Sequence, residues 1–276
     1  MIKIGQYNNL EVVKELEFGV YLDGKEEGEI LLPLRYVPYD TNIGDIITVF
    51  IYYDSEDRII ATTEKPLAQV GEFASLKVKA VNRMGAFLDW GLMKDVLLPF
   101  SEQRADAEEG RYQLVFLYVD DKTNRIVATA KLDKFLDNVP PEYEQNEEVE
   151  LIIWTKTDIG YKVIINELHS GLLYDNEIFA KIWTGKKEKG FIKKIREDDK
   201  IDVSLQAQGY DAIEGVAKEI FEKLQDEGGF IGLNDKSSPE RISSIFGISK
   251  KSFKKAIGTL YKNKLIVIKE DGISVV

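Results

Sequence analysis

The stretch that decides the fold is LEVVKELEFGVYLDGKEEGEILLP, residues 10–33, because LKVKAVNRMGAFLDWGLMKDVLLP, residues 76–99, repeats its pattern. Gly19 of the first copy corresponds to Gly85 of the second, and a Leu-Asp pair and a proline follow both glycines at the same offsets. Self-similarity at a fixed period indicates repeated structural units. The sequence therefore predicts at least two copies of one small domain.

The segments that follow these stretches repeat as well. GDIITVFIYYDSEDRIIATTEK, residues 44–65, matches GRYQLVFLYVDDKTNRIVATAK, residues 110–131, with one extra residue in the turn of the second copy. A third and more diverged copy is VELIIWTKTDIGYKVIINELHSGLLY, residues 149–174, followed by KGFIKKIREDDKIDVSLQ, residues 189–206. Three related units therefore occupy most of the chain.

Each unit contains about five short apolar runs separated by Gly, Asp, Asn and Glu, which is typical of a small antiparallel barrel. Gly19 is then the bend at which a strand curls to close the barrel. Five strands per unit fit an OB-fold, whose sheet face binds oligonucleotides. The strands expected in the first unit are Leu10–Leu16, Val20–Leu22, Glu29–Leu32, Asp45–Tyr53 and Ile59–Thr63.

The C-terminal part has a different period. Beyond residue 208, apolar residues recur at helical spacing from Ile213 onward, and Ser238 and Ser249 are suited to cap two further helices. LIVIKEDGISVV, residues 265–276, is typical of a β-hairpin. Three helices and a hairpin predict a winged helix-turn-helix, with the third helix as the recognition helix.

The predicted fold class is mainly β with a C-terminal α+β domain. Three tandem five-stranded OB-type barrels are expected at residues 1–66, 67–138 and 139–208, and the winged helix at 209–276.

The composition restricts the class of protein. Of the 276 residues, 44% are apolar and 31% charged, and the sequence shows neither a signal-peptide pattern nor an apolar run of membrane-spanning length, so we expect a cytoplasmic protein with no membrane partner. The net charge of −11 argues against coating nucleic acid through bulk charge, which leaves local basic patches.

Catalytic and metal-binding side chains are scarce. The chain has no cysteine, and its one histidine, His169, is expected at a turn, where it is incidental. The pairs Asp120-Asp121 and Asp198-Asp199 fall at expected turns, where aspartate is common for backbone reasons. We therefore expect no enzyme activity, no metal site and no cofactor.

The repeats resemble the S1 domain, an OB-type RNA-binding unit, and the order of the domains resembles the conserved virulence factor B (CvfB) family of bacterial regulatory RNA-binding proteins. The resemblance covers essentially the whole chain. The third unit departs from the pattern by placing Ile159 before its glycine. The matching motifs are Phe18-Gly19-Val20-Tyr21 with Gly44-Asp45 and Asp54 to Arg58, and Met84-Gly85-Ala86-Phe87 with Asp121 to Arg125.

The resemblance implies that aromatic side chains stack on bases, at about 1–3 kcal/mol per base. It assigns this role to Phe18, Tyr21 and Phe87, and leaves Met84 to the core or to a weak contact. The alternative is that one aromatic residue of each pair fills the barrel, and spacing alone does not decide, because side chains alternate across a strand.

Arg58 and Arg125 stand where the S1 pattern places an arginine that contacts phosphate or base, and a guanidinium suits both. The alternative is a local ion pair with Asp54 or Asp121 that tightens the turn. The candidates in the third unit are Tyr161, Lys162 and Lys200.

Two further segments are rich in cations. KIWTGKKEKGFIKK, residues 181–194, has the composition of a track for single-stranded nucleic acid, with a solvated loop as the alternative. Residues 241–264 contain no acid and favour nucleic-acid contact, with protein docking or a soluble helix face as alternatives. The candidates are Trp183, Lys186, Lys187, Lys189, Phe191, Lys193 and Lys194 in the first segment, and Arg241, Lys250, Lys251, Lys254, Lys255 and Lys262 in the second.

These observations lead to the hypothesis of a non-enzymatic RNA-binding protein. The resemblance implies a regulator of gene expression at the RNA or translation level, with single-stranded or structured RNA as partner. DNA, the ribosome and RNA-processing proteins are further partners that this interpretation leaves open. The alternatives are a protein-interaction scaffold and a winged-helix DNA-binding regulator, because these folds host many functions.

Overall fold

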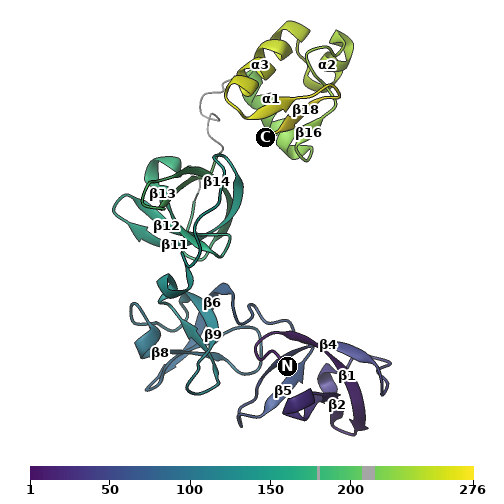
Figure 1. Ribbon diagram of the computed structural model, residues 1–276, viewed down its shortest axis with the longest axis vertical. Helices are drawn as coiled ribbons and strands as arrows, with labels where there is room; N and C mark the ends of the chain where they lie inside the picture. The colour runs from purple at the N-terminus through teal and green to yellow at the C-terminus, as the bar shows by residue number, and fades with distance from the viewer. Residues whose placement is uncertain (179–180, 207–214) are drawn as a thin grey trace. The chain divides into compact units, whose positions relative to one another are not determined.

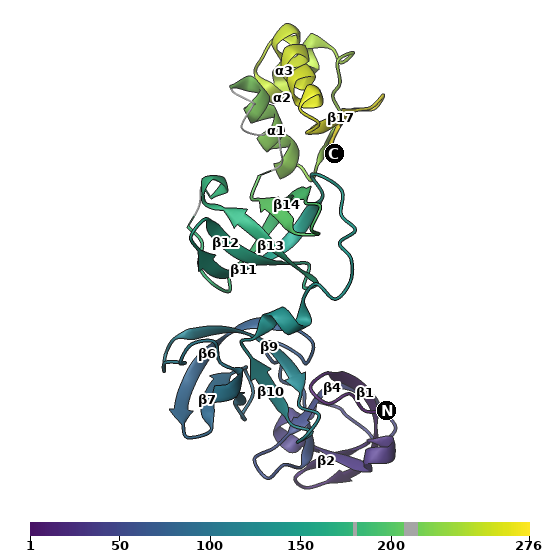
Figure 2. The ribbon, with the colours of Figure 1, turned by 60° about the vertical axis from the view of Figure 1, so that its left-hand side comes forward.

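The computed structural model describes residues 1–178, 181–206 and 215–276. They form two compact units (Figures 1 and 2). The first consists of Met1–Asn138, Glu167–His169 and Trp183–Lys186, and the second of Val139–Asn166, Ser170–Ile182 and Lys187–Val276. Two barrels thus belong to the first unit, and most of the third barrel and the winged helix to the second.

The first barrel is a closed sheet in the strand order β1-β2-β3-β5-β4. β3 and β5 are parallel and the other neighbours antiparallel, which is the Greek-key arrangement of an OB-fold. All five strands predicted for this unit are present. They are β1 (Tyr7–Leu16), β2 (Gly19–Asp23), β3 (Glu29–Pro33), β4 (Ile46–Tyr53) and β5 (Ile59–Thr62).

The second and third barrels repeat this closed order of strands. The second consists of β6 (Phe73–Asn82), β7 (Gly85–Asp89), β8 (Val96–Pro99), β9 (Tyr112–Val119) and β10 (Ile126–Thr129). The third consists of β11 (Glu148–Thr157), β12 (Gly160–Ile165), β13 (His169–Tyr174), β14 (Lys187–Ile195) and β15 (Ile201–Ser204). Short 3-10 helices follow the third strand of each barrel: η2 (Leu34–Tyr36), η3 (Phe100–Glu102) and η5 (Asp175–Glu177). Two more are η1 (Lys25–Glu27) and η4 (Leu132–Phe135).

One glycine begins the second strand of each barrel: Gly19, Gly85 and Gly160, with φ of 151°, 146° and 156°. A Cβ at these positions would lie 2.2, 2.3 and 2.1 Å from a carbonyl oxygen of the third strand in the same barrel. The glycines therefore allow two strands to approach closely, in addition to the predicted bend. Their recurrence shows that the diverged third copy has the same architecture as the first two.

The two barrels of the first unit share an apolar core. The ring of Trp90 packs edge-on against Phe50 at 5.6 Å and against Tyr52 at 6.5 Å, and all three side chains are buried. The backbone amide of Val70 also donates to the carbonyl of Gly5 at 2.8 Å. The first unit is thus one packed body.

The winged helix contains three helices and a three-stranded sheet in the order β16-β18-β17. Ser238 and Ser249 cap the second and third helices, as predicted. The predicted beginning of the first helix near Ile213 lies outside the described residues. No helix among those described has the length and hydropathy that crossing a bilayer requires. The elements are α1 (Val216–Asp226), β16 (Phe230–Ile231), α2 (Pro239–Phe246), α3 (Lys250–Lys262), β17 (Ile266–Ile268) and β18 (Ile273–Val275).

Candidate nucleic-acid interface

In the first barrel, both candidate aromatic side chains lie outside the core. Phe18 is 54% exposed, and its ring packs edge-on against the half-buried ring of Tyr21, with centroids 6.3 Å apart. The neighbouring Val20 and Leu22 point inward and fill the barrel. The ammonium of Lys14, which is opposite Tyr21 on β1, lies 5.5 Å from the Tyr21 ring centroid. The alternative in which one aromatic residue of this pair fills the barrel is therefore wrong.

Arg58 is held by the turn that carries it. Its Nη2 lies 2.7 Å and its Nε 2.9 Å from Oδ2 of Asp54, so the local ion pair is present. The hydrogen bond to Asp54 is the main cause of the raised pKa of Arg58, and Tyr21 is among the smaller causes. Burial opposes ionisation of Asp54, but hydrogen bonds from Arg58 and Glu56 outweigh it and lower the pKa of Asp54. The Arg58 guanidinium stays exposed, and its charge interacts with the Tyr21 side chain.

The second barrel repeats this face with one change. Phe87 lies opposite Ala80, as Tyr21 lies opposite Lys14, so Phe87 occupies the Tyr21 position and is half-buried. Met84, which precedes the glycine, is 55% exposed. Of the two possibilities for Met84, the core is therefore wrong, because this position lies outside the barrel in both copies, and the weak contact stays a prediction.

Arg125 contacts the first barrel. Its guanidinium forms an ion pair with Asp57, at the tip of the β4–β5 turn, whereas the alternative from the sequence was a local pair with Asp121. The alternative of a local pair with Asp121 is therefore wrong, because the packing of the two barrels brings the Asp57 turn to Arg125. Phe87 and Arg125 both line a cavity of about 250 Å³ between the two barrels.

The third barrel presents a cation where the others present a ring. Lys162 lies opposite Thr155 and so occupies the Tyr21 position, with its ammonium 4.9 Å from the ring of Trp154. Tyr161 is one position earlier and packs against the barrel core, beneath the ammonium of Lys156 at 4.6 Å. The sequence named both Tyr161 and Lys162 as candidates, and the register of β11 and β12 gives the outward position to Lys162.

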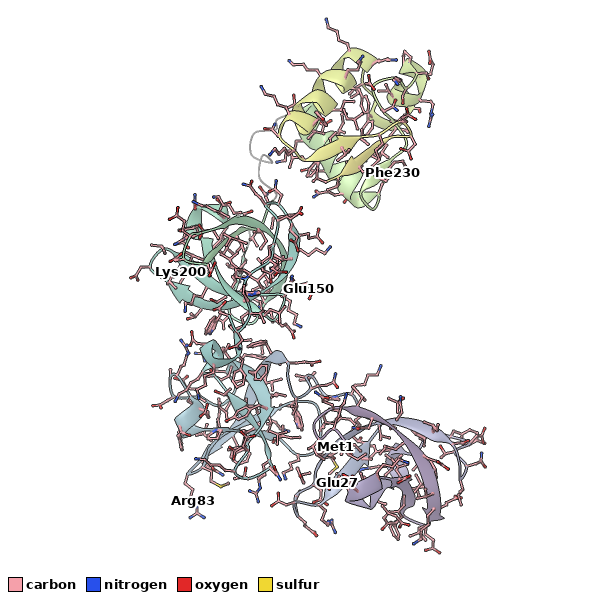
Figure 3. All side chains as sticks on the ribbon, in the orientation of Figure 1. Met1, Glu27, Arg83, Glu150, Lys200 and Phe230 are labelled. Atoms are coloured by element: carbon pink, nitrogen blue, oxygen red, sulfur yellow. The ribbon has the colours of Figure 1, made fainter. Side chains whose placement is uncertain are left out.

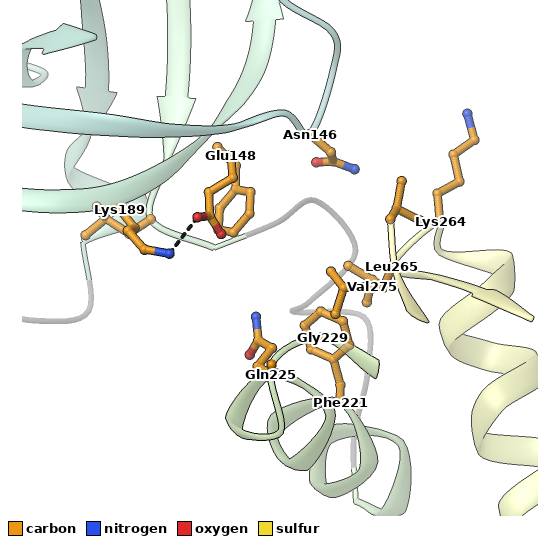
Figure 4. A pocket seen from close by; sticks show the side chains of 13 residues that line it. Asn146, Glu148, Lys189, Phe221, Gln225, Gly229, Lys264, Leu265 and Val275 are labelled. Carbon is orange, nitrogen blue, oxygen red and sulfur yellow. Dashed lines mark hydrogen bonds and ion pairs between the residues drawn. The ribbon is translucent and has the colours of Figure 1, made fainter. Parts of the chain in front are cut away.

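Three of the candidate cations of this barrel, Lys189, Lys193 and Lys200, have acidic partners. Lys189 contacts Glu148 at 2.6 Å, at the edge of a hollow in the second unit (Figure 4). The hydrogen bond to Glu148 raises the pKa of Lys189. Lys200, labelled in Figure 3, lies 2.5 Å from Asp198, whose pKa this hydrogen bond lowers. Lys193 forms an ion pair with Glu177. These pairs reduce the positive charge that the sequence suggests for the third barrel.

The basic segment 181–194 is divided between two units and is not one loop. Lys187, Lys189, Phe191, Lys193 and Lys194 lie on strand β14 of the second unit, which overturns the loop alternative for them. Trp183 and Lys186 belong to the first unit, where the ammonium lies 4.8 Å from the 55% exposed ring.

The exposed lysines of helix α3 have fewer acidic partners than the lysines of the third barrel. Within the described part of the chain, Lys251, Lys255 and Lys262 form no ion pair, and Lys254 lies 3.9 Å from Asp235. The other two candidates donate to backbone carbonyls: Lys250 to Lys236 at 3.3 Å and Arg241 to Gly232 at 3.1 Å.

His169 is the first residue of β13 and is 4% exposed, so its expected place at a turn is wrong. Asp120 accepts hydrogen bonds from Thr123, which lower its pKa, as an aspartate that stabilises a turn does. Among the described residues, no group of three or more His, Asp or Glu side chains is placed to hold a metal ion.

The three closed barrels and the winged helix define a class: a chain of S1 nucleic-acid-binding domains followed by a winged-helix domain. The S1 domain family matches residues 4–64 and 70–131, and the family described as CvfB-like winged helix domain matches residues 218–275. The chain belongs to the CvfB family.

The similarity to known proteins covers nearly the whole chain. Conserved virulence factor B of Staphylococcus saprophyticus is 27% identical over 98% of this chain and 94% of its own length. The Bacillus subtilis protein named Uncharacterized protein YitL is 27% identical over 94% of this chain and 89% of its own length. A crystal structure described as a multidomain protein with nucleic acid binding domains, from Streptococcus pneumoniae, is 25% identical. It covers 99% of this chain and 98% of its own, with a TM-score of 0.47.

Proposed function

We propose that this protein binds single-stranded RNA without catalysing a reaction, and that it regulates gene expression at the RNA or translation level. One observation carries the proposal: in each of the first two barrels, a half-exposed aromatic ring lies on the outer face of an S1 domain that also carries an arginine on the turn between its last two strands. Rings of this kind stack on any base, and arginine pairs with phosphate or stacks on bases.

The lysines of α3 support the proposal in a different way. Exposed ammonium groups without acidic partners can neutralise phosphates and so release the counterions condensed on a nucleic acid, which gives affinity without sequence preference. The same helix has the position in the chain at which the sequence predicts the recognition helix of a winged helix-turn-helix. Binding of duplex DNA through α3 is therefore the second candidate function.

A salt titration of three ligands separates the two functions: a single-stranded RNA, the single-stranded DNA of the same sequence, and its duplex. We expect the single-stranded RNA to bind most tightly and its affinity to fall as salt rises. A preference for the duplex would favour the DNA-binding function. No binding of any of the three at low salt would favour a protein-interaction scaffold.

A further inference from the structure

We propose that the cavity between the first and second barrels holds a single unstacked nucleobase of the bound strand, so that the two barrels form one composite site. This inference rests on the proposed binding of single-stranded RNA. In an isolated S1 domain, one barrel would supply the whole binding face. Here the first barrel contributes residues to the binding face of the second barrel.

The walls of the cavity come from both barrels. Tyr53, Ser55 and Asp57 of the first barrel line it, together with Phe87 and Trp90 of the second. The two sides are fixed relative to each other by the buried contacts of Trp90 with Phe50 and Tyr52. The β4–β5 turn thus covers part of the face that carries Phe87.

The size of the cavity suits a fragment of a strand. Its volume of about 250 Å³ is below the roughly 300–1,000 Å³ typical of sites that enclose a whole small-molecule ligand. Enzymes and binding proteins that take a base out of a stack hold it between aromatic or apolar side chains and contact its edge with polar groups. Phe87, Tyr53 and the rim of Trp90 supply the first kind of contact.

The charges favour a neutral base over a phosphate. The lining contains two carboxylates, Asp57 and Asp95, and two cations, Lys94 and Arg125. Arg125 forms an ion pair with Asp57, and the ammonium of Lys94 lies 3.3 Å from the same carboxylate. A phosphate would compete with Asp57 for both cations. The edge of a base has both hydrogen-bond donors and acceptors, so it can bond to the carboxylates and to the cations. The phosphates of the strand therefore stay outside.

The cavity can be blocked from the side of the first barrel. Ser55 lines it from an exposed turn, so Ser55→Phe adds a ring there without changing charge. Thr48→Phe is the matched control, because Thr48 is exposed on β4 of the same barrel and does not line the cavity. Thermal unfolding of both variants verifies that each is folded.

The test compares a single-stranded RNA with versions of it in which one nucleotide at a time lacks its base. For the wild type and Thr48→Phe, we expect one position at which removal of the base weakens binding by roughly 5- to 150-fold. For Ser55→Phe, we expect that removal of the base at that position no longer weakens binding. An identical profile in all three proteins would overturn the composite site while leaving RNA binding intact, whereas no binding by the wild type would overturn both proposals.

A second measurement detects the base directly at the cavity wall, without the Ser55→Phe substitution. With 5-fluorotryptophan in place of tryptophan, the wild-type protein has three fluorine signals, and Trp90→Phe identifies the one from the cavity wall. We expect the single-stranded RNA to shift the Trp90 signal and the base-deleted version from the sensitive position to leave it in place. An unshifted Trp90 signal with saturating RNA, or a shift with free mononucleotides but not with RNA, would overturn the proposal.

Discussion

Tyr21 and Phe87 occupy the same position of the second strand in two barrels, and both are half-buried. The buried part keeps the ring in one orientation, and the exposed part leaves a face for a base. Phe18 packs edge-on against Tyr21 and so limits its motion. A ring fixed in this way loses little conformational entropy when a base stacks on it.

The glycine before each ring is required by a backbone contact. Gly85→Ala should lower the free energy of unfolding by about 2–5 kcal/mol, from overpacking against the Leu98 carbonyl and from its positive φ. Gly110→Ala is the matched control, because Gly110 also has a positive φ but has no neighbour within 4 Å. Urea denaturation measures both; equal losses would show that the contact with Leu98 is unimportant.

The turn aspartate should make part of the stability depend on pH. The pKa of Asp54 is lowered in the folded state, so its contribution is present above the unfolded value of about 3.9 and is lost as pH falls through the folded value. Asp54→Asn should therefore cost about 1 kcal/mol at pH 7 and less below pH 4. Denaturant titrations at both pH values measure this; a constant difference would contradict it.

At the scale of elements, helix α3 is the strongest candidate for contact with phosphates. Among the described residues, its exposed Lys251, Lys255 and Lys262 form no ion pair. Each phosphate contact with a single strand contributes about 0.7 to the slope of log affinity against log salt. Replacing Lys251 and Lys255 by alanine should therefore flatten the slope by about 1.4. The control replaces Lys3 and Lys65, which are exposed in the first unit, and should leave the slope unchanged. Equal slopes for both double variants would exclude α3 from the interface.

The sequence predicted the elements well because period and capping are local properties. The strands of the first barrel, the capped helices α2 and α3 and the final hairpin follow from alternation, serine caps and an Asp-Gly turn. The outward aromatic position was predicted mainly through the resemblance to the S1 domain, because alternation along a strand alone did not decide it. In the third barrel the sequence named both Tyr161 and Lys162 as candidates, and the strand register of the structure gives the outward position to Lys162.

Other features depend on contacts between distant segments, which a local pattern does not contain. The ion pair of Asp57 with Arg125 connects two barrels. Lys189 of β14 forms an ion pair with Glu148 of another strand, β11. The parts of the candidate site that involve these pairs therefore required the structure.

At the scale of the whole molecule, the first unit should unfold as one body. Trp90→Ala removes a buried ring that contacts Phe50 and Tyr52 of the other barrel, so it should cost about 3–5 kcal/mol. Hydrogen exchange should show reduced protection in both β1 and β6. Reduced protection in β6 alone would mean that the two barrels open independently.

The central claim is that single-stranded RNA stacks on the outward rings of the first two barrels. The most direct measurement is the affinity of Tyr21→Ala with Phe87→Ala for single-stranded RNA across a range of salt concentrations, beside Tyr39→Ala, whose ring is 95% exposed elsewhere in the first barrel. We expect the double variant to bind at least 10-fold more weakly with an unchanged salt slope, because about 1–3 kcal/mol of stacking is lost per base and no charge is removed. Wild-type affinity in a folded double variant would contradict the claim.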